Sequence, residues 1–181
     1  MEDFLHLAKS RRSVRKYNGR NIPKEDLELC CEAARQSPSA CNSQPWKFIV
    51  VDDEKIKKLI AEKVLSGLYN MNTFAASATS YIVMVSENLK LPAMAAGKLL
   101  NMDYKRIDVG IACAHLVLQA QELGIGSCIL GWFNERKLKK ILRVPRGKRI
   151  ELVIALGYPK EPVTREKRLK EKQEVVSFNV Y

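Results

Sequence analysis

The strongest hydrophobic pattern in the chain runs over residues 107–123, where apolar side chains cover most of the circumference of a helix. A helix that is apolar nearly all round is buried on more than one side. In a chain of 181 residues this predicts a central helix, or a helix shared with a second subunit. Gly124 and Gly126 end the pattern.

Shorter patterns predict the other elements. Apolar residues at helical spacing predict helices over 3–9, 24–36, 52–65 and 135–142. Compact apolar runs predict strands over 47–51, 81–85, 127–130 and 150–156. Residues 37–46 hold two prolines and three serines and predict a loop, and residues 87–103 predict an irregular or partly helical segment. The glycine-rich fingerprints of Rossmann and P-loop sites are absent from the sequence.

Length and composition indicate an ordinary globular protein. Apolar residues make up 46% of the chain and charged residues 28%, which suits a single domain spanning residues 1–181. No apolar run reaches the roughly 18 residues of a membrane span, and the first residues lack the apolar core of a signal peptide. The five cysteines form no CxxC pair, which indicates reduced thiols and no metal site. We therefore expect a cytoplasmic protein with no membrane partner.

The net charge of +11 is concentrated towards the C-terminus. Residues 135–172 carry 14 Lys and Arg against 5 Asp and Glu. Such a region indicates nucleic acid, an anionic cofactor or a solvated surface. Tyr158 is the only aromatic residue within it, whereas a base-stacking surface needs several. Nucleic acid is therefore not the expected partner.

Arg11, Arg12, Ser13 and Arg15 form the first candidate binding motif. Guanidinium groups match a phosphate with two parallel donors and stay charged at any cellular pH. A solvated basic patch is the simpler interpretation. The hydroxyl of Ser13 favours a phosphate clamp, because it adds a short neutral donor among the charged ones.

The loop over 37–46 is the second candidate motif. It is either a turn-rich connector or a set of side chains that hydrogen-bond the edge of a polar heterocycle. The second interpretation rests on its many polar side chains, which belong to Ser37, Ser39, Asn42, Ser43 and Gln44.

Together these motifs resemble the FMN-dependent nitroreductase family. The resemblance lies in Arg11-Arg-Ser-Val-Arg-Lys-Tyr17, Ser37-Pro-Ser-Ala-Cys-Asn-Ser-Gln-Pro-Trp-Lys-Phe48, Asp108-Val-Gly-Ile-Ala-Cys-Ala-His115, Leu123-Gly-Ile-Gly-Ser-Cys-Ile-Leu-Gly-Trp-Phe133 and Ile154-Ala-Leu-Gly-Tyr-Pro-Lys160. It implies an α+β fold with a mixed, mainly antiparallel sheet flanked by helices and a long central helix at the interface of a homodimer. It also implies that the tail, about residues 160–181, docks on the partner subunit.

The resemblance implies an FMN site built from both subunits. Its phosphate, ribityl chain and pyrimidine edge would contact Arg11, Arg12, Ser13 and Arg15. The other subunit would add Pro38, Ser39, Ala40, Asn42 and Gln44. Backbone groups of Leu130, Gly131 and Trp132 would line the flavin centre. Lys167 or Arg168 from the tail would complete the phosphate site, and Asn70 or Asn72, with Asn72 preferred, would add a middle contact.

The implied activity is transfer of hydride from NADH or NADPH, then reduction of a nitroaromatic or quinone-type acceptor by a ping-pong mechanism. The cofactor carries this chemistry, so no catalytic side chain is expected. One alternative keeps FMN but catalyses dehalogenation or dehydrogenation, with substrate choice set by a lid within residues 66–105. The other alternative is a basic nucleic-acid-binding module. The sequence does not distinguish NADH from NADPH and does not identify the acceptor.

Overall fold

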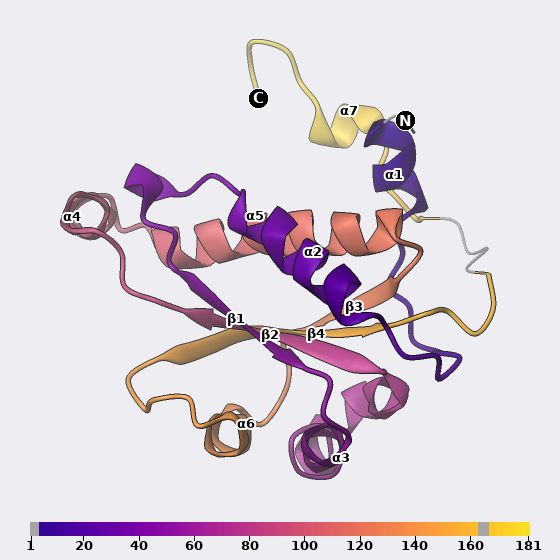
Figure 1. Cartoon of the computed structure of the whole chain (residues 1–181). Coiled ribbons are helices and arrows are strands. Elements are labelled where there is room, and N and C mark those ends of the chain that lie inside the picture. Colours follow the sequence, from indigo (N-terminus) through magenta and orange to yellow (C-terminus); the bar gives the residue numbers. More distant parts are fainter. Residues whose placement is uncertain (1–3, 163–166) are drawn as a thin grey trace.

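The computed structural model describes residues 4–162 and 167–181 (Figure 1). Its centre is a four-stranded antiparallel sheet with the strand order β1-β2-β4-β3. The strands are β1 (Trp46–Val51), β2 (Ser80–Ser86), β3 (Gly126–Leu130) and β4 (Arg149–Gly157). Each predicted strand is confirmed to within one residue at either end.

Helices cover both faces of this sheet. Figure 1 shows α2 (Lys24–Arg35) and α5 (Tyr104–Glu122) on one face, and α3 (Glu54–Lys63) and α6 (Glu135–Leu142) on the other. α1 (Phe4–Ser10) packs against α5. All five predicted helices are therefore confirmed, as is the α+β fold class. The one parallel pairing among the described residues is an isolated bridge between Ser13 and Ser127.

The central strand β2 is buried along its whole length and divides the core into two apolar clusters. Successive side chains of a strand point to opposite faces. Tyr81 and Val83 therefore join the cluster under α3 and α6, whereas Ile82 and Met84 join the cluster under α2 and α5. A strand buried on both faces explains why its sequence reads as a continuous apolar run.

The long helix α5 is buried on one side only. Val109, Ala112 and Leu116 face the sheet and α2. Ile107 and Ala114 lie on the opposite side and are exposed. A single chain therefore leaves an apolar strip on this helix uncovered, so the near-complete apolar circumference is not explained by packing within one subunit.

Two segments have weak helical signals in the sequence. Residues 87–103, expected to be irregular or partly helical, contain the helix α4 (Leu91–Leu100), which agrees with the second of these expectations. The residues before β2 form a 3-10 helix, η2 (Gly67–Ser77), where no element was expected. Both lie at the surface and expose large apolar side chains, so neither has the one-sided pattern that identifies a helix. These exposed side chains include Leu68, Met71, Leu91, Leu99 and Leu100.

The C-terminal tail returns towards the N-terminus. Lys167 donates a hydrogen bond to the backbone carbonyl of Ala8 at the end of α1. The short helix α7 (Lys172–Val175) follows, and the apolar residues after it are exposed. Docking of this tail on a partner subunit stays a prediction. None of the helices in the described ranges has the length and hydropathy needed to cross a membrane.

Candidate functional site

Isolated backbone bridges hold the arginine motif beside the sheet. Ser13 forms a parallel bridge with Ser127 of β3, and the amide of Val14 donates to the Ser127 carbonyl at 2.9 Å. Tyr17 then bridges to Pro159 just beyond β4. These backbone bonds attach both ends of the motif to the rigid sheet.

Val14 and Tyr17 anchor this segment through their side chains, which are only 5% and 6% exposed. A β-carbon on Gly126 would lie 2.7 Å from Val14 Cγ2, and one on Gly157 would lie 2.7 Å from Tyr17 Cδ1. Only glycine therefore allows this close approach. The Tyr17 hydroxyl donates to the Val14 carbonyl at 2.9 Å, and burial raises the pKa of this phenol. Val14 and Tyr17 are buried, whereas Ser13 and Arg15, on either side of Val14, are exposed at the surface.

Positive charge accumulates where α1, the arginine motif and the tail meet. The pKa of Lys167 is lowered by partial desolvation and by the nearby charges of Arg11 and Arg12. Within residues 4–162 and 167–181, neither Arg11 nor Lys167 forms an ion pair with a carboxylate. Of the two tail candidates, Lys167 lies at the cluster. The next residue, Arg168, is exposed, and among the described residues it makes no hydrogen bond or ion pair with the cluster. Three neighbouring cations repel one another, so an anion bound among them would stabilise the cluster.

A second group of contacts joins η2 to the end of β3. Asn72 Nδ2 donates to the Trp132 carbonyl at 2.6 Å, and Trp132 Nε1 donates to the Leu68 carbonyl at 3.1 Å. The Trp132 side chain is still 57% exposed. The guanidinium of Arg15 lies 5.5 Å from the centre of the Phe74 ring, which ties η2 to the arginine motif. Leu130 is buried and Gly131 is exposed at the same end of β3. Because its side chain donates to the Trp132 carbonyl, Asn72 rather than Asn70 joins this group.

The serine- and proline-rich loop forms a separate part of the structure. It contains a short 3-10 helix, η1 (Ala40–Asn42), and three residues in the left-handed region, Cys41, Asn42 and Gln44, with φ of 50°, 50° and 48°. Ser39 Oγ accepts from the Gln44 amide at 2.9 Å, and Gln44 Nε2 donates to Asn42 Oδ1 at 2.8 Å. Pro38, Asn42 and Gln44 are exposed, whereas Ser39 and Ala40 are half-buried.

Asp108 of α5 contacts this loop, although the sequence assigned it no role. Its carboxylate oxygens accept a hydrogen bond from the Ala40 amide at 3.1 and 3.2 Å. The residue is 3% exposed, and burial raises its pKa while the Ala40 bond opposes that shift. The sequence signal was an acidic residue inside the most apolar helix. Phe74, the partner of Arg15, had no comparable signal.

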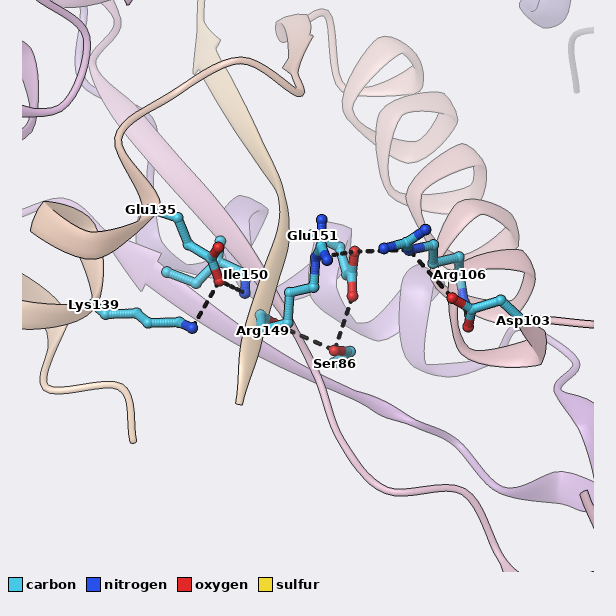
Figure 2. Close-up of polar contacts among 8 residues, drawn as sticks. All are labelled: Ser86, Asp103, Arg106, Glu135, Lys139, Arg149, Ile150 and Glu151. Carbon is cyan, nitrogen blue, oxygen red and sulfur yellow. Dashed lines mark hydrogen bonds and ion pairs between the residues drawn. The ribbon is translucent and has the colours of Figure 1, made fainter. Parts of the chain in front are cut away.

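An ion-pair network fixes the start of α5 on the sheet (Figure 2). Arg106 Nε lies 3.3 Å from Asp103 and 3.6 Å from Glu151, and Arg149 Nε lies 3.3 Å from Glu151. Ser86 Oγ donates to the same Glu151 carboxylate at 3.0 Å. The network joins the start of α5, shortly before Asp108, to β2 and β4.

The arginine motif and the loop lie apart within one chain. Figure 1 shows the loop between α2 and β1 on the side of α4, whereas α1 and the chain after it lie at the other end of α5. Across the described ranges, no hydrogen bond, ion pair or ring contact joins the two groups. The arginine motif, Asn72, Leu130, Gly131, Trp132 and Lys167 therefore make one group, and Pro38, Ser39, Ala40, Asn42 and Gln44 make another.

Comparison with known proteins identifies the family. The model of the family described as "Nitroreductase family" matches residues 8–158. A protein of Archaeoglobus fulgidus named "Putative NADH dehydrogenase/NAD(P)H nitroreductase" is 34% identical over 89% of this chain and 88% of its own.

Two solved structures share the fold over nearly their whole length. An FMN-dependent nitroreductase from Clostridium difficile R20291 is 26% identical, has a TM-score of 0.76 and covers 98% of this chain and 99% of its own. An oxidised iodotyrosine deiodinase bound to FMN and 3-iodo-L-tyrosine is 26% identical, with the same TM-score of 0.76, and covers 99% of this chain and 100% of its own. The chain therefore belongs to the nitroreductase family.

Proposed function

We propose that the protein is an FMN-dependent oxidoreductase that takes hydride from NADH or NADPH and reduces nitroaromatic or quinone-type acceptors by a ping-pong mechanism. The observation that carries the proposal is the cluster of Arg11, Arg12 and Lys167 beside the backbone-fixed Ser13. A phosphate monoester carries close to two negative charges, and these residues supply the cations to neutralise it. Membership of the nitroreductase family supports the same cofactor.

Different residues of the proposed site would bind different parts of FMN. Arg11, Arg12 and Lys167 would hold the phosphate, and the exposed hydroxyl of Ser13 would add a neutral donor to the ribityl end. Arg15 would meet the pyrimidine edge, where its guanidinium is already oriented by Phe74. The strand end at Leu130, Gly131 and Trp132 would line the ring, with Asn72 holding the Trp132 carbonyl in place.

Bound FMN supplies the hydride-accepting chemistry, so the protein needs no catalytic acid, base or nucleophile. With FMN bound, Arg15 would contribute a fixed positive charge near the pyrimidine edge, and such a charge raises the reduction potential.

We propose that two copies assemble to complete each site. The two groups of site residues lie apart in one chain, and α5 leaves an apolar strip uncovered between them. Packing these strips together would cover Ile107 and Ala114. It would also let the loop of one copy, with Ser39 and Asn42, reach the arginine motif of the other. The exposed apolar residues of the tail would add contact area on the partner.

A second candidate function keeps the same cofactor but removes a halogen from an aromatic substrate. The observation in its favour is the full-length similarity to the iodotyrosine deiodinase. The exposed surfaces of η2 and α4 carry Leu68, Met71, Leu91 and Leu99, which suit a flat apolar acceptor better than a zwitterionic amino acid. We therefore favour the reductase.

Binding of FMN to the purified protein tests the proposal. The expected result is a saturable flavin spectrum and quenched flavin fluorescence when FMN is added to apoprotein. Riboflavin, which lacks the phosphate, is the matched control ligand and should bind at least tenfold more weakly. Apoprotein that gains no flavin would contradict the proposal. Turnover of iodotyrosine in preference to quinones would select the second candidate.

A further inference from the structure

The loop that carries Pro38 to Gln44 is held in a conformation that its residues do not favour. Cys41, Asn42 and Gln44 all have φ near +50°, in the left-handed region that non-glycine residues rarely adopt. Strained backbone of this kind persists only when surrounding contacts over-determine it, and it concentrates at functional sites.

Most contacts that hold the loop come from within it. Ser39 and Asn42 pair with Gln44, and the Ser43 amide donates to the Ala40 carbonyl at 3.0 Å. One outside contact is the amide of Lys90, which donates to Ser43 Oγ at 3.1 Å but lies just before the surface helix α4. The contact from the rigid core is the Asp108 carboxylate, which binds the Ala40 amide across 68 positions of sequence.

Burying the carboxylate of Asp108 costs free energy that its contact with the loop would explain. Only 3% of the residue is exposed, and no Lys or Arg in the described part of the chain pairs with it. Arg106, the nearest cation in sequence, is bound instead to Asp103 and Glu151. A buried carboxylate without a countercharge costs free energy, and burial accordingly raises its pKa.

Helix capping does not explain Asp108. The N-cap of α5 is Asp103, whose side chain accepts from the Arg106 amide at 3.4 Å. Asp108 lies more than one turn further along, where the backbone amide already has a partner within the helix. Its carboxylate serves the loop and not the helix.

We infer that Asp108 is a positioning residue of the flavin site, which fixes the Ala40 amide and so holds the loop in the shape that reaches the flavin of the partner subunit. The inference rests on the proposed FMN function and extends it to a residue that does not itself contact the cofactor. A carboxylate is suited to this work because it accepts only, and hydrogen bonds to an ionised acceptor are the stronger ones.

The decisive variant is Asp108→Asn, which preserves size but removes the charge. We expect the dissociation constant for FMN to rise about tenfold, because a charge-assisted hydrogen bond is replaced by a weaker neutral one. The matched control is Asp52→Asn, which makes the same chemical change at an exposed position between β1 and α3 and should leave FMN affinity unchanged. The melting temperature of the apoprotein should not fall in Asp108→Asn, because the change removes an unpaired buried charge.

Hydrogen exchange of the apoprotein gives a second measurement that needs no cofactor. Exchange at the Ala40 amide should be faster in Asp108→Asn and unchanged in Asp52→Asn. The inference is overturned if wild type binds FMN and Asp108→Asn binds it equally well, or if Ala40 exchange does not change. It is also overturned if the variant loses affinity only because its apoprotein melts at a lower temperature. Wild-type protein that binds no FMN would instead refute the proposed function, and the exchange result would still decide whether Asp108 positions the loop.

Discussion

At the scale of single residues, the candidate site is a group of positive charges that the fold brings close together. Lys167 comes from the tail and Arg11 and Arg12 from the chain after α1, and the two arginines lower the pKa of the lysine. A protein gains nothing from such repulsion in the absence of a ligand. The cluster is therefore best explained as a site prepared for an anion.

Lys167→Met tests this explanation. Protonated Lys167 is disfavoured in the folded chain, so at neutral pH it lowers the free energy of unfolding. This penalty disappears as the pH rises through the lowered pKa. The resulting rise in the free energy of unfolding with pH should be absent in Lys167→Met. Phosphate should raise the melting temperature of wild-type apoprotein by a few degrees more than chloride at equal ionic strength, and of Lys167→Met by less. Lys170→Met, which changes an exposed lysine of the same tail, is the control, and an equal loss in it would point to general screening.

In the proposed site, Arg15 would serve the ring end of FMN rather than the phosphate end. Its guanidinium lies over Phe74, away from the contacts of Lys167. Arg15→Gln should lower the reduction potential of bound FMN by tens of millivolts, because a fixed positive charge near the reduced ring is lost. Potentiometric titration measures this shift. Lys16→Gln, which removes the neighbouring exposed charge, should change the potential much less, and equal shifts would mean that only net charge matters.

At the scale of elements, the arginine motif is positioned by packing and not by its own secondary structure. Val14 and Tyr17 insert against Gly126 and Gly157, and two bridges attach the segment to β3 and to the chain beyond β4. The orientation of Ser13 and Arg15 follows from these buried neighbours.

Gly126→Ala should disturb this packing. The new methyl group would lie 2.7 Å from Val14 Cγ2, so Val14 and the arginine motif must shift. Overpacking of this kind costs about 1–3 kcal/mol, which calorimetry should detect together with weaker FMN binding. Gly147→Ala places its methyl group in open space and should change stability by less than about 0.5 kcal/mol. Unchanged affinity in Gly126→Ala would separate the motif from the site.

Most of the elements could be predicted because their apolar residues face the core. Strand β2 reads as an apolar run since it is buried on both faces, and α5 reads as apolar because it carries a core face and an uncovered strip. η2 and α4 lacked such a signal, because their large apolar side chains are exposed. For the site, the motifs identified the arginines and the loop. Asp108 and Phe74 act through contacts distant in sequence, which spacing alone does not encode.

At the scale of the whole molecule, one chain carries two groups of site residues that do not meet. The loop fixed by Asp108 and the group around Lys167 lie towards different ends of α5 (Figure 1). A symmetric dimer with α5 at its interface would bring the loop of each copy to the arginine motif of the other. Assembly and cofactor binding should therefore be coupled.

Ala114→Glu places a charge in the centre of the exposed strip of α5. Light scattering should show wild type as a dimer and Ala114→Glu as a monomer, because an unpaired charge is costly in an apolar interface. FMN affinity should fall at least tenfold with the loss of the dimer. Lys140→Glu, on the exposed side of α6 across the sheet, should remain dimeric and bind FMN normally. A monomer that keeps full FMN affinity would show that one chain builds the whole site.

The most direct test of the central claim is anaerobic mixing of FMN-loaded protein with NADH or NADPH, followed by a quinone. The visible flavin absorbance should disappear on adding at least one of the two donors. It should return when the quinone is added after the donor is exhausted, as a ping-pong mechanism requires. Flavin that stays oxidised with both donors, although chemical reductants bleach it, would contradict the proposed oxidoreductase function.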